Sequence, residues 1–397
     1  MELKKIAIQQ PSLPKYRIPV FSQLNSDHAL DVTLFYGSQA DLPNMKATGF
    51  KAERTNSLRL KLPGLGELFL DWTQLKICGD RSWDAIVLTW NTRYLTLIPS
   101  LLRAKFNGIP VILWGHGYSK KRGFLRDFIR RTVSRLAKAV LFYDPVSMKA
   151  FSNPGNNHTC FVAPNAIDQR PILEQRDAWT SEPDKLGHFR LQHDLKEREI
   201  VLFVSRYDPN NRLDILIQAM SEVKKLRPQS LLTIIGSGND REKEELKNLV
   251  NSLNLSENVR FLGSIYRENE IAPWFLSAKI FCYPSNVGLS LLHAFGYGIP
   301  VLLGDDFSRC NPEIYAFEND FNGCTFVEGS STDLSKQIVN LLADDSLRQQ
   351  LSTNGIQTVA NKASLDNMVQ GFAVAIKAVA KTTPARAINK NSHPRNR

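Results

Sequence analysis

Short runs of apolar and β-branched residues alternate with segments of helical period along nearly the whole chain. Each run is continuously apolar, which is typical of strands buried on both faces of a parallel sheet. The pattern stops over residues 170–199, where charged residues and glutamine predominate, and then begins again. We therefore predict an α/β protein with two doubly wound, Rossmann-like domains in series. The predicted strands cover 5–10, 31–37, 83–90, 109–115, 138–144 and 160–165, and then 199–206, 230–238, 258–263, 279–285, 299–304 and 324–329.

This break sets the expected domain limits. We expect a first domain over 1–180 and a second over 190–363, followed by a helix over 364–380 that could cross back to the first domain. The basic tail over 381–397 contains no acidic residue and is expected to be disordered. Parallel sheets of this kind bind ligands outside the carboxyl ends of their strands, so two facing domains predict a central cleft.

Positive charge is concentrated in the first half of the chain. Residues 1–180 contain 25 Lys and Arg against 14 Asp and Glu, whereas residues 181–397 contain 25 of each, and the whole chain has a net charge of +11. The basic half is expected to face an anionic partner such as lipid headgroups, an acidic glycan or nucleic acid.

Cysteine usage and the absence of a leader pattern favour a cytoplasmic protein. Five scattered cysteines form no C-x-x-C pair, which fits a reducing compartment, and residues 1–12 break into glutamines and a proline where a signal peptide would continue with apolar residues. Residues 280–304 are uncharged and long enough to span a bilayer, but their prolines and glycines predict strand, loop, helix and strand instead.

Two segments of the second half place phosphate-binding groups at strand ends. Gly236 begins a G-S-G turn after a predicted strand. This turn can bind a phosphate, or it can be a simple strand-to-helix turn. It is not a dinucleotide fingerprint, because Arg241 stands where the third glycine would be. Arg206 ends another strand, and Arg212 lies near the start of the next helix. Two guanidinium groups at one strand mouth could hold a diphosphate, although both could equally be solvated surface residues.

A third segment, P-S-N-V-G-L-S-L-L-H-A-F-G-Y-G-I-P-V over 284–301, joins a strand to a helix through Gly288. The first-turn amides of that helix are expected to point into the cleft as an anion site. His293 lies one to two turns inside the helix, where a histidine is more often half-buried than functional.

These motifs resemble, in their order, the C-terminal domain of glycosyltransferase family 4. The resemblance rests on S-R before a helix, F-L-G at 261–263, the 284–301 segment, P-E at 312–313 and N-G at 322–323. The first half is similar more loosely, through PSLPKYRIPVF (11–21), WGHG (114–117) and APNAID (163–168). The resemblance covers roughly residues 4–380 and implies the GT-B fold, a nucleotide-sugar donor, independence of metal and retention of anomeric configuration.

The resemblance also implies roles for individual residues. Arg206 would contact the donor diphosphate, and Arg212 would replace a lysine whose position is taken by Asn211. Ile265 and Tyr266 would lie at the nucleotide base. The remaining implied donor contacts are Gly236, Ser285, Asn286, Val287, Gly288, Leu289, Ser290 and His293.

The family's two glutamates, spaced E-x7-E, fall on Ser285 and His293 in this chain. Serine, asparagine and neutral histidine can still hydrogen-bond sugar and ribose hydroxyls. The loss of a carboxylate beside the sugar also removes the electrostatic repulsion that an acidic sugar would meet there. We therefore expect the donor sugar to be either a uronic acid or a neutral hexose.

Four further residues are candidates at the cleft. Glu313 falls on the family's P-E and is the nearest surviving carboxylate, with a surface salt bridge as the alternative. His116, between two glycines at a strand end, resembles the histidine near the donor sugar. Tyr16 and Arg17 lie in the first strand-to-helix loop, where the resemblance places acceptor or phosphate contacts.

Residues 120–138 contain eight cations against one acid, with apolar residues at helical spacing. Such a helix could lie on an anionic membrane, or it could be a core helix with a solvated outer face. His and Cys show no metal-ligand spacing, and no nucleic-acid-binding motif is present.

The sequence therefore predicts a cytoplasmic, peripherally membrane-bound, retaining glycosyltransferase that uses a UDP- or GDP-sugar and a glycan or lipid-linked acceptor. Catalysis is expected to depend on His116, Arg206, Arg212 and Glu313. The alternatives are a non-catalytic glycan- or nucleotide-binding relative and a GT-B sugar-nucleotide epimerase.

Overall fold

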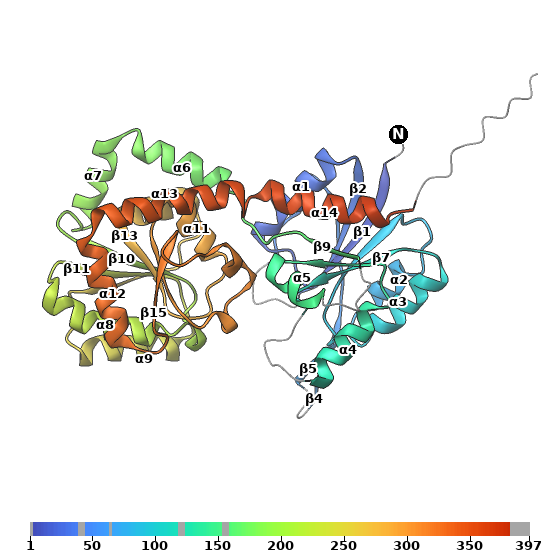
Figure 1. Cartoon of the computed structure of the whole chain (residues 1–397), viewed down its shortest axis with the longest axis horizontal. Coiled ribbons are helices and arrows are strands. Elements are labelled where there is room, and N and C mark those ends of the chain that lie inside the picture. Colours follow the sequence, from blue (N-terminus) through green and yellow to red (C-terminus); the bar gives the residue numbers. More distant parts are fainter. Residues whose placement is uncertain (1–2, 39–43, 63–65, 118–123, 153–158, 382–397) are drawn as a thin grey trace, which may run out of the picture.

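The structure, a computed structural model, describes residues 3–38, 44–62, 66–117, 124–152 and 159–381. It contains two α/β lobes, each built around its own parallel sheet (Figure 1). The predicted two-domain α/β architecture is therefore confirmed. The basic tail expected to be disordered, beyond Lys381, lies outside the described residues.

The N-terminal sheet has seven parallel strands in the order β3-β2-β1-β6-β7-β8-β9. The order reverses between β1 and β6, and such a switch point is where doubly wound sheets bind ligands. The strands are β1 (Lys4–Gln10), β2 (Leu30–Tyr36), β3 (Lys51–Arg54), β6 (Ala85–Thr89), β7 (Val111–Gly115), β8 (Ala139–Phe142) and β9 (Thr159–Val162). The helices are α1 (Ile18–Asp27), α2 (Trp72–Ile77), α3 (Leu97–Phe106), α4 (Phe124–Ser134) and α5 (Pro145–Phe151).

Three strands of this domain were not predicted. Strand β3 is a largely exposed edge strand of sequence KAER, and β4 (Leu58–Leu62) pairs with β5 (Gly66–Leu70) in a separate antiparallel hairpin. These strands bury little apolar surface, so the apolar runs that mark the central strands are missing from them.

The C-terminal sheet has six parallel strands in the order β12-β11-β10-β13-β14-β15, with its switch point between β10 and β13. The strands are β10 (Glu199–Val204), β11 (Ser230–Ile235), β12 (Val259–Gly263), β13 (Ala278–Tyr283), β14 (Val301–Gly304) and β15 (Gly323–Phe326). The helices are α8 (Leu213–Leu226), α9 (Asp240–Ser252), α10 (Glu268–Ser277), α11 (Ser290–Tyr297), α12 (Ser331–Ala343) and α13 (Asp345–Asn361).

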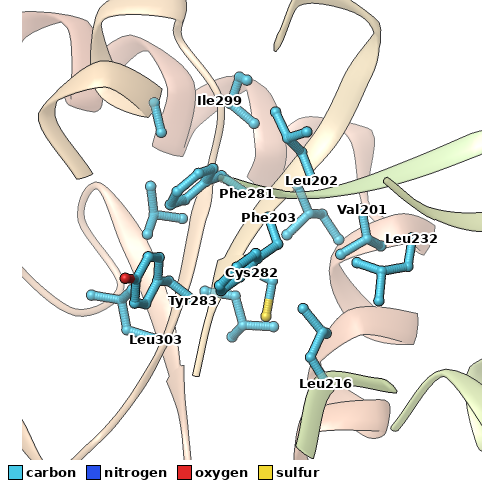
Figure 2. Packing of buried hydrophobic residues seen from close by; sticks show 14 of the residues in the cluster. Val201, Leu202, Phe203, Leu216, Leu232, Phe281, Cys282, Tyr283, Ile299 and Leu303 are labelled. Atoms are coloured by element: carbon cyan, nitrogen blue, oxygen red, sulfur yellow. The ribbon is translucent and has the colours of Figure 1, made fainter. Parts of the chain in front are cut away.

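The core of the C-terminal domain explains why its strands are continuously apolar. Side chains on both faces of the central strands are buried, including Val201, Leu202, Phe203 and Phe281 (Figure 2). Helices cover both faces of the sheet, so neighbouring strand residues that point in opposite directions are both removed from water. The burial of so many large side chains makes the sheet a rigid support for the loops at its edge.

The segment over 170–199, expected to be irregular, contains two helices, α6 (Arg170–Thr180) and α7 (Pro183–Gln192). Helix α6 packs on α10 and α11, and Ile172 joins the C-terminal core. The N-terminal domain therefore ends before Arg170, earlier than residue 180. The helical period was not visible because these helices bury few side chains.

Helix α14 (Leu365–Val379) continues the chain from the C-terminal lobe onto the N-terminal one (Figure 1). Its apolar side packs on α1 and on β7, β8 and β9, and Phe372 and Met368 are buried in the N-terminal core. The last helix thus joins the two domains a second time.

Within the described part of the chain, no helix is both long and apolar enough to cross a membrane. Residues 280–304 fold as strand, loop, helix and strand, as predicted.

Candidate active site

The two strands at the C-terminal switch point end in polar residues. Ser205 and Arg206 follow β10, and Ser285 and Asn286 follow its neighbour β13. The carboxyl ends of adjacent parallel strands meet at one edge of the sheet, so these four residues lie together.

A chain of hydrogen bonds holds these strand ends in place. The Tyr283 hydroxyl donates to Ser205 Oγ over 2.7 Å, and Asn211 Nδ2 donates to the same oxygen over 3.1 Å and to the Arg206 carbonyl over 2.9 Å. Asn286 Nδ2 in turn donates to Asn211 Oδ1 over 3.2 Å. Asn211 is buried and links both loops of the switch point, so the residue at the family's lysine position has a positioning role here.

The two predicted arginines differ in their surroundings. Arg206 is exposed at the end of β10. Arg212 lies in left-handed backbone (φ 54°), and its guanidinium donates two hydrogen bonds of 3.1 Å to the carboxylate of Asp214. This pairing, together with the charge of Glu328, raises the pKa of Arg212. Asp214 therefore offsets part of the positive charge that Arg212 could offer to a diphosphate.

Gly236 lets the turn after β11 approach the end of β10. It has φ 148°, and a Cβ atom at this position would overlap the carbonyl oxygen of Ser205. The backbone of the turn therefore lies against the switch point, as the predicted phosphate loop requires.

The loop after β13 leads directly into α11. Val287 is buried, and its carbonyl accepts a hydrogen bond of 2.8 Å from the Asn311 amide. Gly288 and Leu289 follow, and the helix begins at Ser290. Amides in the first turn of a helix have no partner within the helix, so this end can bind an anion next to Ser285.

Glu328, which sequence reasoning missed, supplies a carboxyl group beside Ser285. Ser285 Oγ donates a hydrogen bond of 2.8 Å to Glu328 Oε1. The Glu328 side chain can pass the end of β14 because that strand ends in Gly304, where a Cβ atom would lie 2.9 Å from Glu328 Oε2. Oε2 is buried and has no hydrogen-bond partner within the described ranges. Glu328 follows β15 at the same edge of the sheet, which is the signal that could have identified it.

Residue 285 itself carries no carboxylate, but a carboxyl group from elsewhere in the sequence lies beside it. Glu328 comes from a different strand and brings its charge to Ser285 and toward Arg212. The electrostatic basis for expecting an acidic donor sugar is lost with it.

A second carboxylate that sequence reasoning missed, Glu268, pairs with His293. His293 Nε2 lies 2.8 Å from Glu268 Oε1, and the Tyr297 hydroxyl donates to the same oxygen over 2.7 Å. Burial alone would raise the pKa of Glu268, but the hydrogen bonds and charge of its partners outweigh burial and lower it. A carboxylate only accepts, so the His293 Nε2–H donates to Glu268 Oε1.

The predicted base-binding loop faces the N-terminal domain. Ile265 packs against the C-terminal core, whereas Tyr266 is exposed. The Tyr266 carbonyl accepts a hydrogen bond of 3.5 Å from Lys15, which lies in the loop after β1. This contact shows that the carboxyl edges of the two sheets face each other.

On the N-terminal side the predicted residues form an aromatic group. Arg17 is only 5% exposed, and its guanidinium lies 4.7 Å from the Trp114 ring, 5.0 Å from Tyr16 and 5.4 Å from Tyr143. The His116 ring is exposed and lies 4.7 Å from Tyr143. The structure thus brings Tyr16, Arg17 and His116 together around Tyr143.

Glu313 joins this group from the other domain. It is buried, and its Oε1 accepts a hydrogen bond from Asn165 Nδ2 across the domain boundary. Burial raises the pKa of Tyr143 to about 12; nearby Arg17 opposes that rise, and Tyr16 and Glu313 add to it. Glu313 therefore lies close to the aromatic group, in the interior and not at the surface.

The structure therefore forms two groups of predicted residues. Arg206, Arg212, Ser285 and Asn286 lie at the C-terminal switch point, and Tyr16, Arg17, His116 and Glu313 lie at the facing edge. Across the described parts of the chain, no group of three or more His, Cys, Asp or Glu side chains is arranged to hold a metal ion.

Comparison with known proteins finds a family match in the C-terminal half. Residues 188–358 match the family described as "Glycosyl transferases group 1". A GDP-mannose-dependent phosphatidylinositol monomannoside mannosyltransferase from Mycolicibacterium smegmatis is 28% identical over 190 residues, which are 45% of this chain and 48% of that protein. A related mannosyltransferase from Corynebacterium glutamicum is 32% identical over 155 residues, 36% of this chain and 38% of its own length. The matches thus span about half the length, or less, of these curated relatives.

Solved structures match over nearly the whole chain. HepE from Anabaena, crystallised with UDP, aligns with a TM-score of 0.70 at 16% identity and covers 95% of this chain and 100% of its own. The sucrose-phosphate synthase of Thermosynechococcus elongatus aligns with a TM-score of 0.66 at 16% identity, covering 94% of this chain and 98% of its own. These likenesses confirm the predicted fold. The chain thus has the GT-B fold, and its residues 188–358 match the group 1 glycosyl transferases.

Proposed function

We propose that this protein is a retaining glycosyltransferase that moves a neutral hexose from a UDP- or GDP-sugar to a glycan or lipid-linked acceptor. The observation that carries the proposal is the switch point of the C-terminal sheet, where Arg206, the Gly236 turn and the start of α11 meet around the bonded Ser205–Asn211–Asn286 network. Cations and helix-terminal amides at one sheet edge suit a diphosphate. The curated relatives named above are GDP-mannose-dependent, and HepE was crystallised with UDP, so both bases stay in the proposal.

Each group in the site has a proposed part. Arg206, helped by Arg212 and the amides near Gly288, stabilises the charge on the leaving diphosphate, which is the largest contribution expected in such a transfer. Val287, Leu289 and Ser290 shape that loop, and Ile265 and Tyr266 flank the base. Because the leaving group is stabilised by these cations and amides, we propose that no metal is required.

The sugar and ribose hydroxyls are proposed to meet two bonded pairs. Ser285 with Glu328 lies nearest the proposed sugar, and His293 with Glu268 lies toward the ribose. Carboxyl oxygens accept strongly from hydroxyl groups, so these pairs can orient a neutral hexose. The charge of Glu328 would repel a uronic acid, and for this reason we now propose a neutral donor.

The facing domain is proposed to hold the acceptor and to exclude water. His116 and Tyr16 lie at its edge, and Glu313 with Asn165 ties the domains together beside them. Closure over the donor would limit its hydrolysis.

We propose a cytoplasmic enzyme that works at the membrane surface, with the basic segment over 120–138 as its first contact. Residues 118–123 lie outside the described residues, but on α4 the side chains of Phe128 and Ile129 are exposed. The alternative is a core helix with a solvated outer face, because Val133 of α4 is buried in the N-terminal core.

The test is turnover of UDP- and GDP-hexoses with and without lipid-linked or glycan acceptors, measured as release of nucleoside diphosphate. A transferase releases the diphosphate only with an acceptor, and Arg206→Ala abolishes that release. An epimerase converts the donor without any acceptor. Binding of the nucleotide without turnover on any acceptor tested would favour the non-catalytic alternative, which the paired state of Arg212 makes worth testing.

A further inference from the structure

Helix α3 carries apolar side chains on two sides. Leu97, Leu101 and Ala104 are buried in the N-terminal core. Ile98, Leu102 and Phe106 recur every four residues on the outer side, and Phe106 is 86% exposed. Residues four apart form one stripe on a helix, so the outer stripe is a continuous apolar strip that the core does not use.

Neighbouring elements extend this strip into a surface. Trp72 is exposed at the start of α2, which packs on α3, and Leu95 is exposed just before α3 begins. Helix α4 contributes exposed Phe128 and Ile129, and its buried Val133 lies in the same core cluster as Leu97 and Leu101. Helices α3 and α4 therefore cover the same face of the sheet, and both lie on the outer side of the N-terminal lobe (Figure 1). We call this the α3–α4 face: Trp72, Leu95, Ile98, Leu102, Phe106, Phe128 and Ile129.

Basic residues predominate around the α3–α4 face, with Asp127 on α4 as an exposed acid beside Phe128. Residues 85–126 contain no Asp or Glu. Arg93, Arg103 and Lys105 are exposed beside the apolar stripe, and Arg131 is exposed on α4. An apolar strip bordered by cations matches the boundary between acyl chains and anionic headgroups.

From this combination we infer that the α3–α4 face docks on an anionic lipid bilayer, with α3 lying in the plane of the membrane. A second copy of the chain is a poorer occupant, because self-pairing would bring Arg103 and Lys105 of both copies together. Leu95 follows β6 at the carboxyl edge of the sheet, so the docked face reaches the edge where the acceptor is proposed to bind. The proposed function already places the basic segment over 120–138 at the membrane, and this inference adds α2 and α3 to that contact. It does not depend on transfer activity.

The test is co-sedimentation of the full chain with large vesicles of phosphatidylcholine, alone or mixed with phosphatidylglycerol. Wild-type protein binds the mixed vesicles, and Leu102→Ser with Phe106→Ser lowers the binding constant by at least roughly tenfold. Leu226→Ser is the matched control, because Leu226 is 70% exposed at the end of α8 in the other domain. Arg103→Glu with Lys105→Glu removes the preference for anionic vesicles.

The double serine variant is expected to bind nucleotide as wild type does, because its substitutions lie outside the proposed donor site. Its nucleotide affinity therefore tests the proposed function separately from membrane docking. Equal binding of wild type to neutral and anionic vesicles would overturn the inference, as would unchanged binding of the double serine variant. Light scattering that shows a wild-type dimer lost in that variant would also overturn it, by identifying a second copy as the occupant.

Discussion

The two sheets meet the domain boundary with different chemistry. At the C-terminal edge hydrogen bonds hold Ser205, Asn211, Asn286 and Ser285, and the carboxyl group of Glu328 is bonded to Ser285. At the N-terminal edge a buried arginine lies among three aromatic rings. The first arrangement holds polar side chains at the sheet edge by hydrogen bonds, whereas the second holds a loop by packing. Two domains of the same fold therefore stabilise their facing edges by different interactions.

Gly236→Ala should have the largest effect, because the turn after β11 packs there directly against the backbone at the end of β10. The new Cβ would overlap the Ser205 carbonyl oxygen, so we expect a loss of about 3 kcal/mol or more in the free energy of unfolding. Urea unfolding measures this loss. Gly187→Ala is the control, since that glycine lies in α7 with nothing within 4 Å of an added Cβ, and a similar loss in both variants would contradict the close approach.

Arg17→Ala tests whether the N-terminal edge is held by packing. Removal of a buried side chain from three aromatic rings should lower the free energy of unfolding by about 2 kcal/mol and leave nucleotide affinity unchanged. The control is Arg93→Ala, because that exposed guanidinium lies 5.7 Å from the Phe69 ring of the same domain and should contribute about 0.5 kcal/mol or less. Loss of nucleotide binding in Arg17→Ala, with normal stability, would show that Arg17 belongs to the donor site instead.

Glu328→Gln sharpens the comparison at the sugar end of the C-terminal edge. We expect kcat/KM for the sugar donor to fall about tenfold, equal to about 1.4 kcal/mol, while the Kd of the free nucleoside diphosphate changes less, because Glu328 is hydrogen-bonded to Ser285 at the proposed sugar end of the site. Steady-state kinetics and calorimetry provide the two quantities. Glu270→Gln, at an exposed carboxylate on α10, should change neither. A fall in nucleotide affinity equal to the fall in kcat/KM would contradict the assignment of Glu328 to the sugar end of the site.

The smallest effect is the pH dependence of the Glu268–His293 pair. The pKa of Glu268 is lower in the folded protein than its ordinary value of about 4.3, so the pair stabilises the fold above that pH and loses this contribution as pH falls through the folded value. The difference in free energy of unfolding between wild type and Glu268→Gln should therefore shrink from about pH 5 to about pH 3. A difference that stays constant over this range would mean that Glu268 has no lowered pKa.

The central strands could be predicted from sequence because burial on both faces leaves a continuous apolar run, as in Val201 to Phe203. The position of Arg206 and Ser285 at one edge followed from the rule for parallel strands. The same rule places Glu328 at this edge after β15, but its contact with Ser285 depends on Gly304 at the end of the intervening strand. Glu268 could not be found in this way, because it lies at the start of a helix and pairs with a histidine on another helix. The pairing of Arg212 with Asp214 depends on a left-handed residue that no periodicity reveals.

Helices α6 and α7 were missed for a related reason. Their sequence is mostly polar, and only a few residues such as Ile172 and Phe189 pack against the C-terminal core. A helix that buries so little has no clear apolar period, and its docking is decided by tertiary contacts.

The most direct test of the donor site is calorimetric titration of UDP, GDP and ADP in the presence of a chelator. Wild type should bind UDP or GDP with micromolar Kd, and Arg206→Ala should weaken that binding by roughly a hundredfold because a charge-assisted contact to phosphate is lost. Arg241→Ala, at an exposed arginine on α9 of the same domain, should bind as wild type does. Absence of binding to all three nucleotides, or equal binding by the Arg206 and Arg241 variants, would contradict a nucleotide-sugar site at the C-terminal switch point.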